Sequence, residues 1–200
     1  MWYAAYGSNL LRERFMLYLE GGQFRTQGRP HEGARNNSAP IDDRVLRVDH
    51  QMSFGYHSSR WGGGVSFLDP NPGSGEALVR CWSVTREQFA DIAAQENGLA
   101  VGDIDVDLDR LTAEGSVPLT SGWYGLGLVL GEIDGAPVVT FTAPEPVTPT
   151  TPGSPYLEVI LNGLTEMGAA SDPVSAASYL LGCPGVSPSW AIDALSSLHP

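Results

Sequence analysis

Long hydrophobic runs are absent from this 200-residue sequence. No apolar stretch approaches the roughly 20 residues that a membrane-spanning helix needs. The first 15 residues also lack the basic start and long apolar stretch of a secretory signal. We therefore expect a cytoplasmic protein without membrane contact. Hydrophobic residues still make up 42% of the chain, enough for one domain with a core of its own.

Positive charge is scarce. The chain has 11 lysines and arginines against 23 aspartates and glutamates, which gives a formal net charge of -12. Nucleic acids and anionic membrane surfaces are bound through basic faces, so this balance argues against both as partners. The acidity is typical of a soluble protein and points to no particular ligand.

Residues that bind metals are also few and badly spaced for it. Cys81 and Cys183 have no CxxC partner, and histidines 31, 50, 57 and 199 have no ligand-like spacing. The acidic run 103–109 resembles a calcium loop but lacks its central glycine and final glutamate, so an acidic strand face explains it better. The glycines form no GxGxxG or phosphate-binding loop. We expect neither a metal nor a cofactor.

Glycine and proline, by contrast, are plentiful, with 24 and 15 copies that punctuate the chain into short elements. Alternating or β-branched segments predict strands, and segments with an apolar face at helical spacing predict helices. The expected strands cover 2–6, 44–48, 51–57, 64–69, 76–84 and 101–111, with a hairpin over 121–144 that turns at Asp134-Gly135; the expected helices cover 10–19, 85–98, 154–168, 172–183 and 187–198.

The order of these elements is strands, one helix, strands and then helices, which favours an α+β fold over a doubly wound sheet. Six or more consecutive antiparallel strands in a chain of this length could close into a small barrel with helices outside. No composition shift marks a domain boundary, so residues 1–200 are predicted to form one domain. Within it, residues 170–200 form a helical C-terminal extension whose role the sequence leaves open.

The opening stretch poses the main functional question, because its apolar strand breaks at Gly7-Ser8-Asn9 just before a helix. Glycine lets the backbone turn and come close to a ligand, and Ser8 or Asn9 can cap the helix that follows. The free amides of such a turn can also hold a carboxylate or carbonyl oxygen. A capped turn without any ligand explains the same residues.

Four stretches in one order resemble the γ-glutamylcyclotransferase-like family and its AIG2-like relatives. They are "YGSN" at Tyr6, the glycine-rich "RWGGGVSFLDPNPGSGEALVRCWSV" with Trp61, the helix "REQFADIAAQENG" with Glu96, and "GSPYLEVILNGLTEMG" with Tyr156. The likeness runs from residue 1 to about 168.

The resemblance implies a small, distorted, mostly antiparallel β-barrel with flanking helices and a reaction that uses no metal or cofactor. In that reaction the α-amine of a γ-glutamyl group attacks its own γ-carbonyl, which releases 5-oxoproline and an amine or amino acid. The resemblance makes Glu96 the general acid and base of this lyase-like or transferase-like step. It places the small-molecule γ-glutamyl substrate against Tyr6, Gly7, Ser8, Asn9, Leu10, Trp61 and Tyr156.

One departure from the family pattern concerns the catalytic helix. Asn97 stands between Glu96 and Gly98, where the family usually has glycine directly after the glutamate. One extra helical residue turns a side chain by about 100°, so the direction of Glu96 is open, with Glu87 as the second choice of acid. A catalytically silent ligand-binding domain of the same fold is the alternative function. A serine hydrolase using Ser8 is disfavoured, because "GSN" is not a nucleophile elbow. The leaving amine and the oligomeric state, including a homodimer, stay open.

Overall fold

The first apolar run of the chain forms strand β1 (Trp2–Ala5) inside a six-stranded sheet. The computed structural model describes residues 1–25 and 29–190. β1 pairs antiparallel with β5 (Ala77–Ser83) and parallel with β8 (Ala136–Thr142). Because β1 has a neighbour on each edge and is covered on both faces, all four of its residues are buried, which explains an apolar run without alternation.

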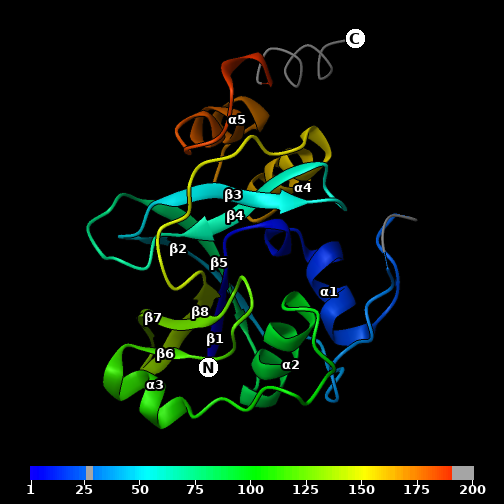
Figure 1. The fold of residues 1–200 in the computed structure, drawn as a ribbon, viewed down its shortest axis with the longest axis vertical. Coiled ribbons are helices and arrows are strands. Elements are labelled where there is room, and N and C mark those ends of the chain that lie inside the picture. Colours follow the sequence, from blue (N-terminus) through cyan, green and yellow to red (C-terminus); the bar gives the residue numbers. More distant parts are fainter. Residues whose placement is uncertain (26–28, 191–200) are drawn as a thin grey trace.

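The six-stranded sheet has the order β2-β5-β1-β8-β7-β6, and only its β1–β8 pair is parallel. The other two strands form a separate antiparallel ribbon that lies across one end of the sheet (Figure 1). The α+β class is confirmed, but the described residues form two sheets and no closed barrel. The remaining strands are β2 (Asp43–Val48), β3 (Met52–Ser58), β4 (Gly63–Leu68), β6 (Ser116–Pro118) and β7 (Leu126–Ile133).

The helices flank the sheets in two groups. α1 and α2 pack against one face of the six-stranded sheet, while α4 and α5 lie on the far side of the β3–β4 ribbon (Figure 1). No helix within residues 1–25 and 29–190 is long and apolar enough to cross a membrane. The helices are α1 (Arg12–Glu20), α2 (Arg86–Glu96), α3 (Leu108–Glu114), α4 (Ser154–Glu166) and α5 (Pro173–Leu181).

β1 divides the core into two clusters, because successive side chains of a strand point to opposite faces. Tyr3 and Ala5 pack with α1 and α2, whereas Trp2 and Ala4 pack with the ribbon and α4. The end of β1 therefore lies where both clusters meet.

The predicted strand over 101–111 is wrong. Ile104 and Val106 are buried and the intervening Asp105 is exposed, so the alternation describes burial correctly. The segment pairs with no neighbouring strand, however, and it ends where the Asp107 carboxylate caps α3 by accepting a hydrogen bond from the Arg110 amide at 3.0 Å. Alternation predicts which side chains are buried but not whether a partner strand is present.

Other local predictions are confirmed. β7 and β8 form the hairpin that turns at Asp134-Gly135, both with positive φ angles. The helices expected after residue 154 and after residue 172 are present as α4 and α5, and α5 packs into the same core as the ribbon through Ala176 and Leu180. Most of the helix predicted over 187–198 falls outside the described residues.

Candidate active site

After β1 the chain makes one turn of 3₁₀-helix, η1 (Ser8–Leu10), before α1 begins. Side chains from β5 hold the carbonyl groups of this turn. The Trp82 indole Nε1 donates to the Asn9 carbonyl and an Arg80 nitrogen donates to the Leu10 carbonyl, both at 3.0 Å. The carbonyls are thus fixed from the sheet side. The first amides of η1 have no partner within the helix, and that of Ser8 interacts with the Tyr156 hydroxyl at the cavity.

Gly7 lies where there is no room for a side chain. A β-carbon at this position would lie 2.2 Å from Ser66 Oγ and 2.8 Å from the Tyr156 hydroxyl. These two hydroxyl groups are hydrogen-bonded to each other at 2.7 Å, and the Ser66 amide also donates to Tyr156 at 3.3 Å. The glycine is needed because the backbone of the opening turn passes directly over this buried hydroxyl pair.

α2 brings Glu96 to the same place. Its start is the predicted capping box, in which Thr85 Oγ1 accepts from the Gln88 amide and the Gln88 side chain accepts from the Thr85 amide. Glu96 is the last helical residue, and its Oε1 accepts a hydrogen bond from Asn9 Nδ2 at 2.9 Å. A carboxylate and the opening turn, 87 residues apart in the chain, are therefore in direct contact.

The inserted Asn97 does not turn Glu96 away. The Asn97 side chain donates to the carbonyls of Ala93 and Tyr124 and accepts from the Tyr124 amide at 3.1 Å. It caps the helix and fixes the 121–125 loop beside the site. Gly98 follows this cap, and its φ angle of 68° suits glycine.

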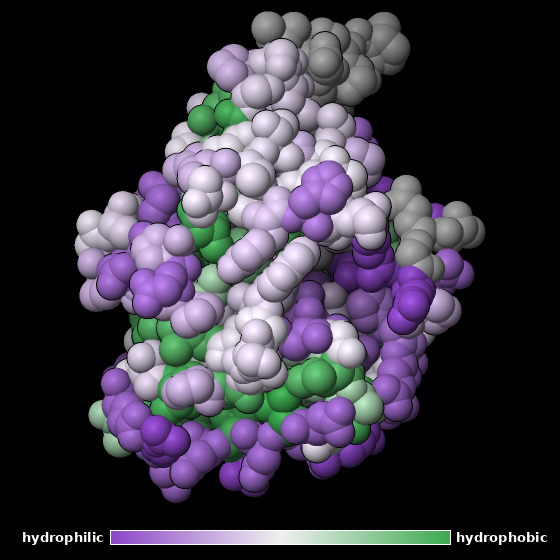
Figure 2. Space-filling model, viewed as in Figure 1, coloured by the Kyte–Doolittle hydropathy of each residue, from purple (hydrophilic) through white to green (hydrophobic). Residues whose placement is uncertain are grey.

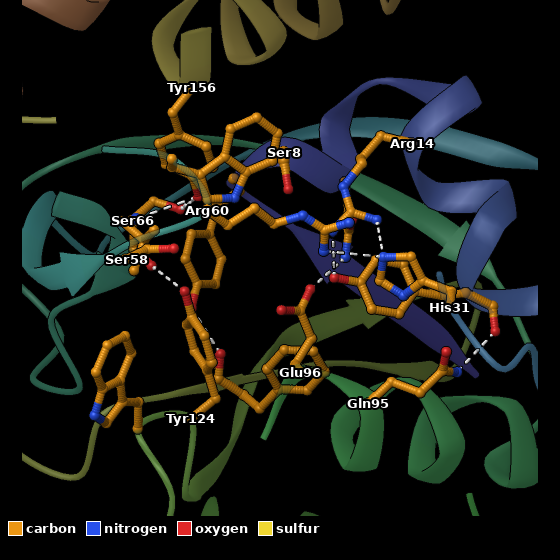
Figure 3. A pocket seen from close by; sticks show the side chains of 18 of the residues that line it. Ser8, Arg14, His31, Ser58, Arg60, Ser66, Gln95, Glu96, Tyr124 and Tyr156 are labelled. Carbon is orange, nitrogen blue, oxygen red and sulfur yellow. Dashed lines mark hydrogen bonds between the residues drawn. The ribbon is translucent and has the colours of Figure 1, made fainter. Parts of the chain in front are cut away.

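The opening turn and Glu96 face one cavity of about 200 Å³ (Figure 3). Most of the residues predicted as catalytic or substrate-binding line the cavity, although their roles stay predictions. They are Tyr6, Gly7, Ser8, Asn9, Trp61, Glu96 and Tyr156.

Leu10 was predicted to bind substrate, but it does not line the cavity. Its side chain is fully buried on the other side of the turn, against α4. A β-carbon at Gly163 of α4 would lie only 2.6 Å from Leu10 Cβ, so the helix approaches the turn as closely as glycine allows. Leu10 anchors the turn to α4.

Aromatic side chains form most of the walls. The Tyr6 hydroxyl donates to the Phe141 carbonyl at 2.8 Å, so this ring is a fixed wall. Trp61 is buried, with its ring centroid 5.0 Å from that of Tyr156. Burial raises the pKa of five lining tyrosines above the usual value, so their hydroxyls are neutral near pH 7; these are Tyr3, Tyr6, Tyr18, Tyr124 and Tyr156.

Sequence reasoning missed a basic cluster on the cavity wall, made by Arg14 of α1, His31 of the following loop and Arg60 of the β3–β4 turn (Figure 3). His31 Nε2 lies 2.6 Å from an Arg14 nitrogen and 3.3 Å from an Arg60 nitrogen. For Arg14 a signal was available, because it occupies the otherwise apolar face of its helix. His31 and Arg60 lie in turn-rich segments without any periodic signal. Also missed were Tyr3, Tyr18, Ser58, Val65, Ser66, Gln95, Trp123, Tyr124 and Phe141.

His31 is held as a neutral imidazole. Burial first, and then the Arg14 and Arg60 charges, lower its pKa to about 3. Its Nε2 therefore accepts from the guanidinium groups. A histidine with such a low pKa is a poor general base near pH 7, and no hydrogen bond joins Ser8 to a histidine among the described residues, so the site does not favour a serine hydrolase.

Neither the second candidate acid nor a group of metal-binding side chains lies in the described part of the site. Glu87, the second choice of acid, lies at the start of α2, where it pairs with Arg35 at 3.5 Å on the surface and does not line the cavity. Within residues 1–25 and 29–190, no group of three or more histidine, cysteine, aspartate or glutamate side chains is placed to hold a metal ion.

The arrangement of strands and helices is similar to that of solved structures. One is a protein named gamma-glutamyl cyclotransferase, with a TM-score of 0.54, 18% identity and coverage of 98% of both chains. Another is a human protein described as uncharacterized, with a TM-score of 0.55 and 20% identity over 98% of this chain and 97% of the other. The chain therefore has the γ-glutamyl cyclotransferase fold.

Sequence comparison adds one curated relative. The chain is 34% identical over 194 residues to "Histone deacetylase 5" of Arabidopsis thaliana, a match that covers 86% of this chain and 29% of that protein. The chain thus spans less than a third of the relative's length. No family model matches the sequence.

Gly7→Ala should destabilise the protein. The new methyl group would collide with Ser66 Oγ, and overpacking of this kind typically costs about 1–3 kcal/mol. The free energy of unfolding, measured in urea, checks this. Adding Ser66→Ala leaves a contact of 3.6 Å to Ser66 Cβ, so the double variant should regain part of the loss. A Gly7→Ala protein as stable as the wild type would show that the close approach is absent.

His31→Asn should flatten the pH dependence of stability. Above pH of about 6.5 the histidine is neutral in both states, and below it the unfolded chain takes up a proton that the folded protein does not accept until about pH 3. Wild-type stability should therefore fall through this window as the pH is lowered. Asparagine keeps an acceptor oxygen but does not titrate. The free energy of unfolding, measured in urea at pH 7, 5 and 4, checks this. An equal change of that free energy with pH in the two proteins would contradict it.

Proposed function

We propose that this chain, with its γ-glutamyl cyclotransferase fold, converts a γ-glutamyl compound into 5-oxoproline and a free amine or amino acid. The observation that supports this most is the 2.9 Å hydrogen bond between Asn9 Nδ2 and Glu96 Oε1. It puts a carboxylate next to the turn whose first amides can hold an oxygen of the substrate.

The proposed reaction is an intramolecular aminolysis. The Glu96 carboxylate takes a proton from the α-ammonium group, and the resulting amine attacks the γ-carbonyl carbon, which forms the new C–N bond. The protonated Glu96 then gives its proton to the departing nitrogen as the original amide C–N bond breaks. The attacking nitrogen loses its second surplus proton through the same carboxylate to the released amine, so the products are the lactam and an ammonium ion. One carboxylate therefore serves as base and then as acid, and the step as written consumes no other reactant.

Asn9 is suited to orient the α-amine. Its Nδ2 donates to Glu96 Oε1 and to the Tyr3 hydroxyl, which leaves Oδ1 as a buried acceptor without a hydrogen-bond partner in the described residues. An amine between Asn9 Oδ1 and the Glu96 carboxylate would satisfy that acceptor. Its proton would then lie within reach of the base.

The opening turn is suited to the charge that develops on oxygen. The Gly7, Ser8 and Asn9 amides stabilise the oxyanion of the tetrahedral centre, and removal of one such donor typically costs about 2.7–4 kcal/mol. Because nucleophile and electrophile belong to one molecule, the enzyme's remaining task is to hold the γ-glutamyl chain folded. Correct alignment can lower a barrier by as much as about 7–11 kcal/mol.

A ligand-binding domain without catalysis is the second candidate. It is favoured by the curated relative, in which the matching segment is less than a third of a protein named for deacetylation. That name describes the whole relative and is not carried to this chain. The two candidates differ in turnover: a binding domain would hold 5-oxoproline or a γ-glutamyl compound but release no product.

Glu96→Gln should abolish 5-oxoproline formation. The amide keeps the size of the side chain but cannot shuttle a proton, so kcat should fall by about 10²–10⁴, as is typical when a general acid or base is lost. Mass spectrometry of 5-oxoproline, with a panel of γ-glutamyl amino acids and amines, measures this. Binding of the same compounds by calorimetry should persist.

Glu87→Gln is the matched control on the same helix, since Glu87 pairs with Arg35 at the surface. It should leave the rate unchanged. Full activity of Glu96→Gln, or loss of activity in Glu87→Gln alone, would refute the assignment of the acid. Absence of product from every compound tested with the wild-type protein would leave the binding domain as the function.

A further inference from the structure

Arg14 is a buried arginine that forms no ion pair with a carboxylate of the described residues. Its side chain is 2% exposed, and no ion pair involves it. Its terminal nitrogens contact His31 Nε2 and the Tyr18 hydroxyl, while its Nε is buried without a hydrogen-bond partner. A buried charge without a counter-ion is costly, so its place on a cavity wall points to a ligand anion.

Arg60 brings a second positive charge to the same point. It extends from the β3–β4 turn until its Nη1 lies 3.3 Å from His31 Nε2, the atom that Arg14 also contacts (Figure 3). His31 is neutral and relieves none of the repulsion between the guanidinium groups, which the charge of Glu96 on Arg60 offsets in part. An anion between the two arginines would relieve it, because guanidinium pairs bind carboxylates through charge-assisted hydrogen bonds.

The cavity lining has a charge opposite to that of the whole protein. Two arginines and one acidic residue, Glu96, line it, whereas the chain carries a formal net charge of -12. Figure 2 shows strongly hydrophilic residues gathered on the side where α1 and its following loop lie. A cationic leaving group would meet like charges here, and an anionic one would meet opposite charges.

Of the two arginines, Arg60 lies on the more open side of Glu96, and Arg14 is buried beside it. Ser66 and Tyr156, on the other side of the cavity, are 1% and 3% exposed, whereas Arg60 and His31 are partly exposed. Glu96 has to reach both the attacking and the departing nitrogen. The bound substrate therefore extends to both sides of the Glu96 carboxylate. The γ-glutamyl part fits the closed side, and the leaving part fits the open side.

We propose that Arg14 and Arg60 form a subsite that binds an acidic group on the leaving amine. The preferred substrate is then a γ-glutamyl compound whose leaving part carries a carboxylate, and a γ-glutamyl polyamine is disfavoured. This assignment rests on the proposed cyclotransferase function for the direction of the substrate. The arginine pair sets specificity and takes no part in the proton transfer.

Three matched compounds test the subsite: γ-glutamylglycine, γ-glutamylglycinamide and the mono-γ-glutamyl derivative of ethylenediamine. They share the reacting group and carry a negative, neutral and positive leaving part. For the wild type, kcat/KM should be highest for the acid, by about 10- to 150-fold over the amide, as expected for a charge-assisted hydrogen bond. It should be lowest for the amine.

Arg60→Gln and Arg14→Gln should each reduce the acid-to-amide ratio of kcat/KM at least several-fold. Arg60 is the safer change, because it is partly exposed and its replacement leaves the core intact if Arg14→Gln does not fold. Arg110→Gln, which removes an arginine of α3 paired with Glu114 at the surface, is the charge control and should leave the ratio unchanged.

Calorimetric binding to the Glu96→Gln protein separates the subsite from catalysis. Tighter binding of γ-glutamylglycine than of its amide, with the preference lost in Glu96→Gln/Arg60→Gln, supports the subsite even if the wild type forms no 5-oxoproline. In that case the proposed cyclotransferase function is refuted and the proposed subsite is still supported. Equal binding of acid and amide, a preference that survives loss of Arg60, or no binding of either compound would overturn the proposal.

Discussion

The contact between Asn9 and Glu96 is the constraint on which the site depends. It joins a turn at the end of the central strand to the last residue of a helix that lies on one face of the sheet. Each partner is held independently: Trp82 and Arg80 fix the turn, and Asn97 caps the helix end. Because both supports come from rigid elements, the carboxylate and the turn amides keep their geometry without a bound ligand.

Buried polar groups without a partner lower stability, and a ligand at this contact would satisfy them. Asn9 Oδ1 and Arg14 Nε have no hydrogen-bond partner in the described residues, and Gly7 is squeezed against two hydroxyls. Each of these features makes folding less favourable, and a core without a binding role would avoid it. A ligand with an amine near Asn9 and an acid near Arg14 would satisfy both orphan groups, and γ-glutamyl amino acids and peptides have this pattern of charges.

The sequence predicted those parts of the site that depend on local chain geometry. The glycine turn after β1, the capping box of α2 and the hairpin at Asp134-Gly135 each follow from neighbouring residues. It could not predict the cluster of Arg14, His31 and Arg60, because three separate segments meet there only after folding. The same limit applies to the alternating segment 101–111: its pattern of buried side chains was predicted correctly, but it pairs with no strand. It also applies to the expected closed barrel, because the described strands form two separate sheets.

In the proposed function, the opening turn and Glu96 hold one small molecule between them. A crystal structure of the protein soaked with 5-oxoproline tests this, because the lactam ring shows where the attacking nitrogen and the γ-carbonyl carbon lie in the cavity. Lactam density is expected in the 200 Å³ cavity, with one oxygen on the amides of residues 7–9 and the ring nitrogen beside the Glu96 carboxylate. Density elsewhere on the protein, or a Glu96 side chain turned out to solvent with the cavity filled, would contradict it.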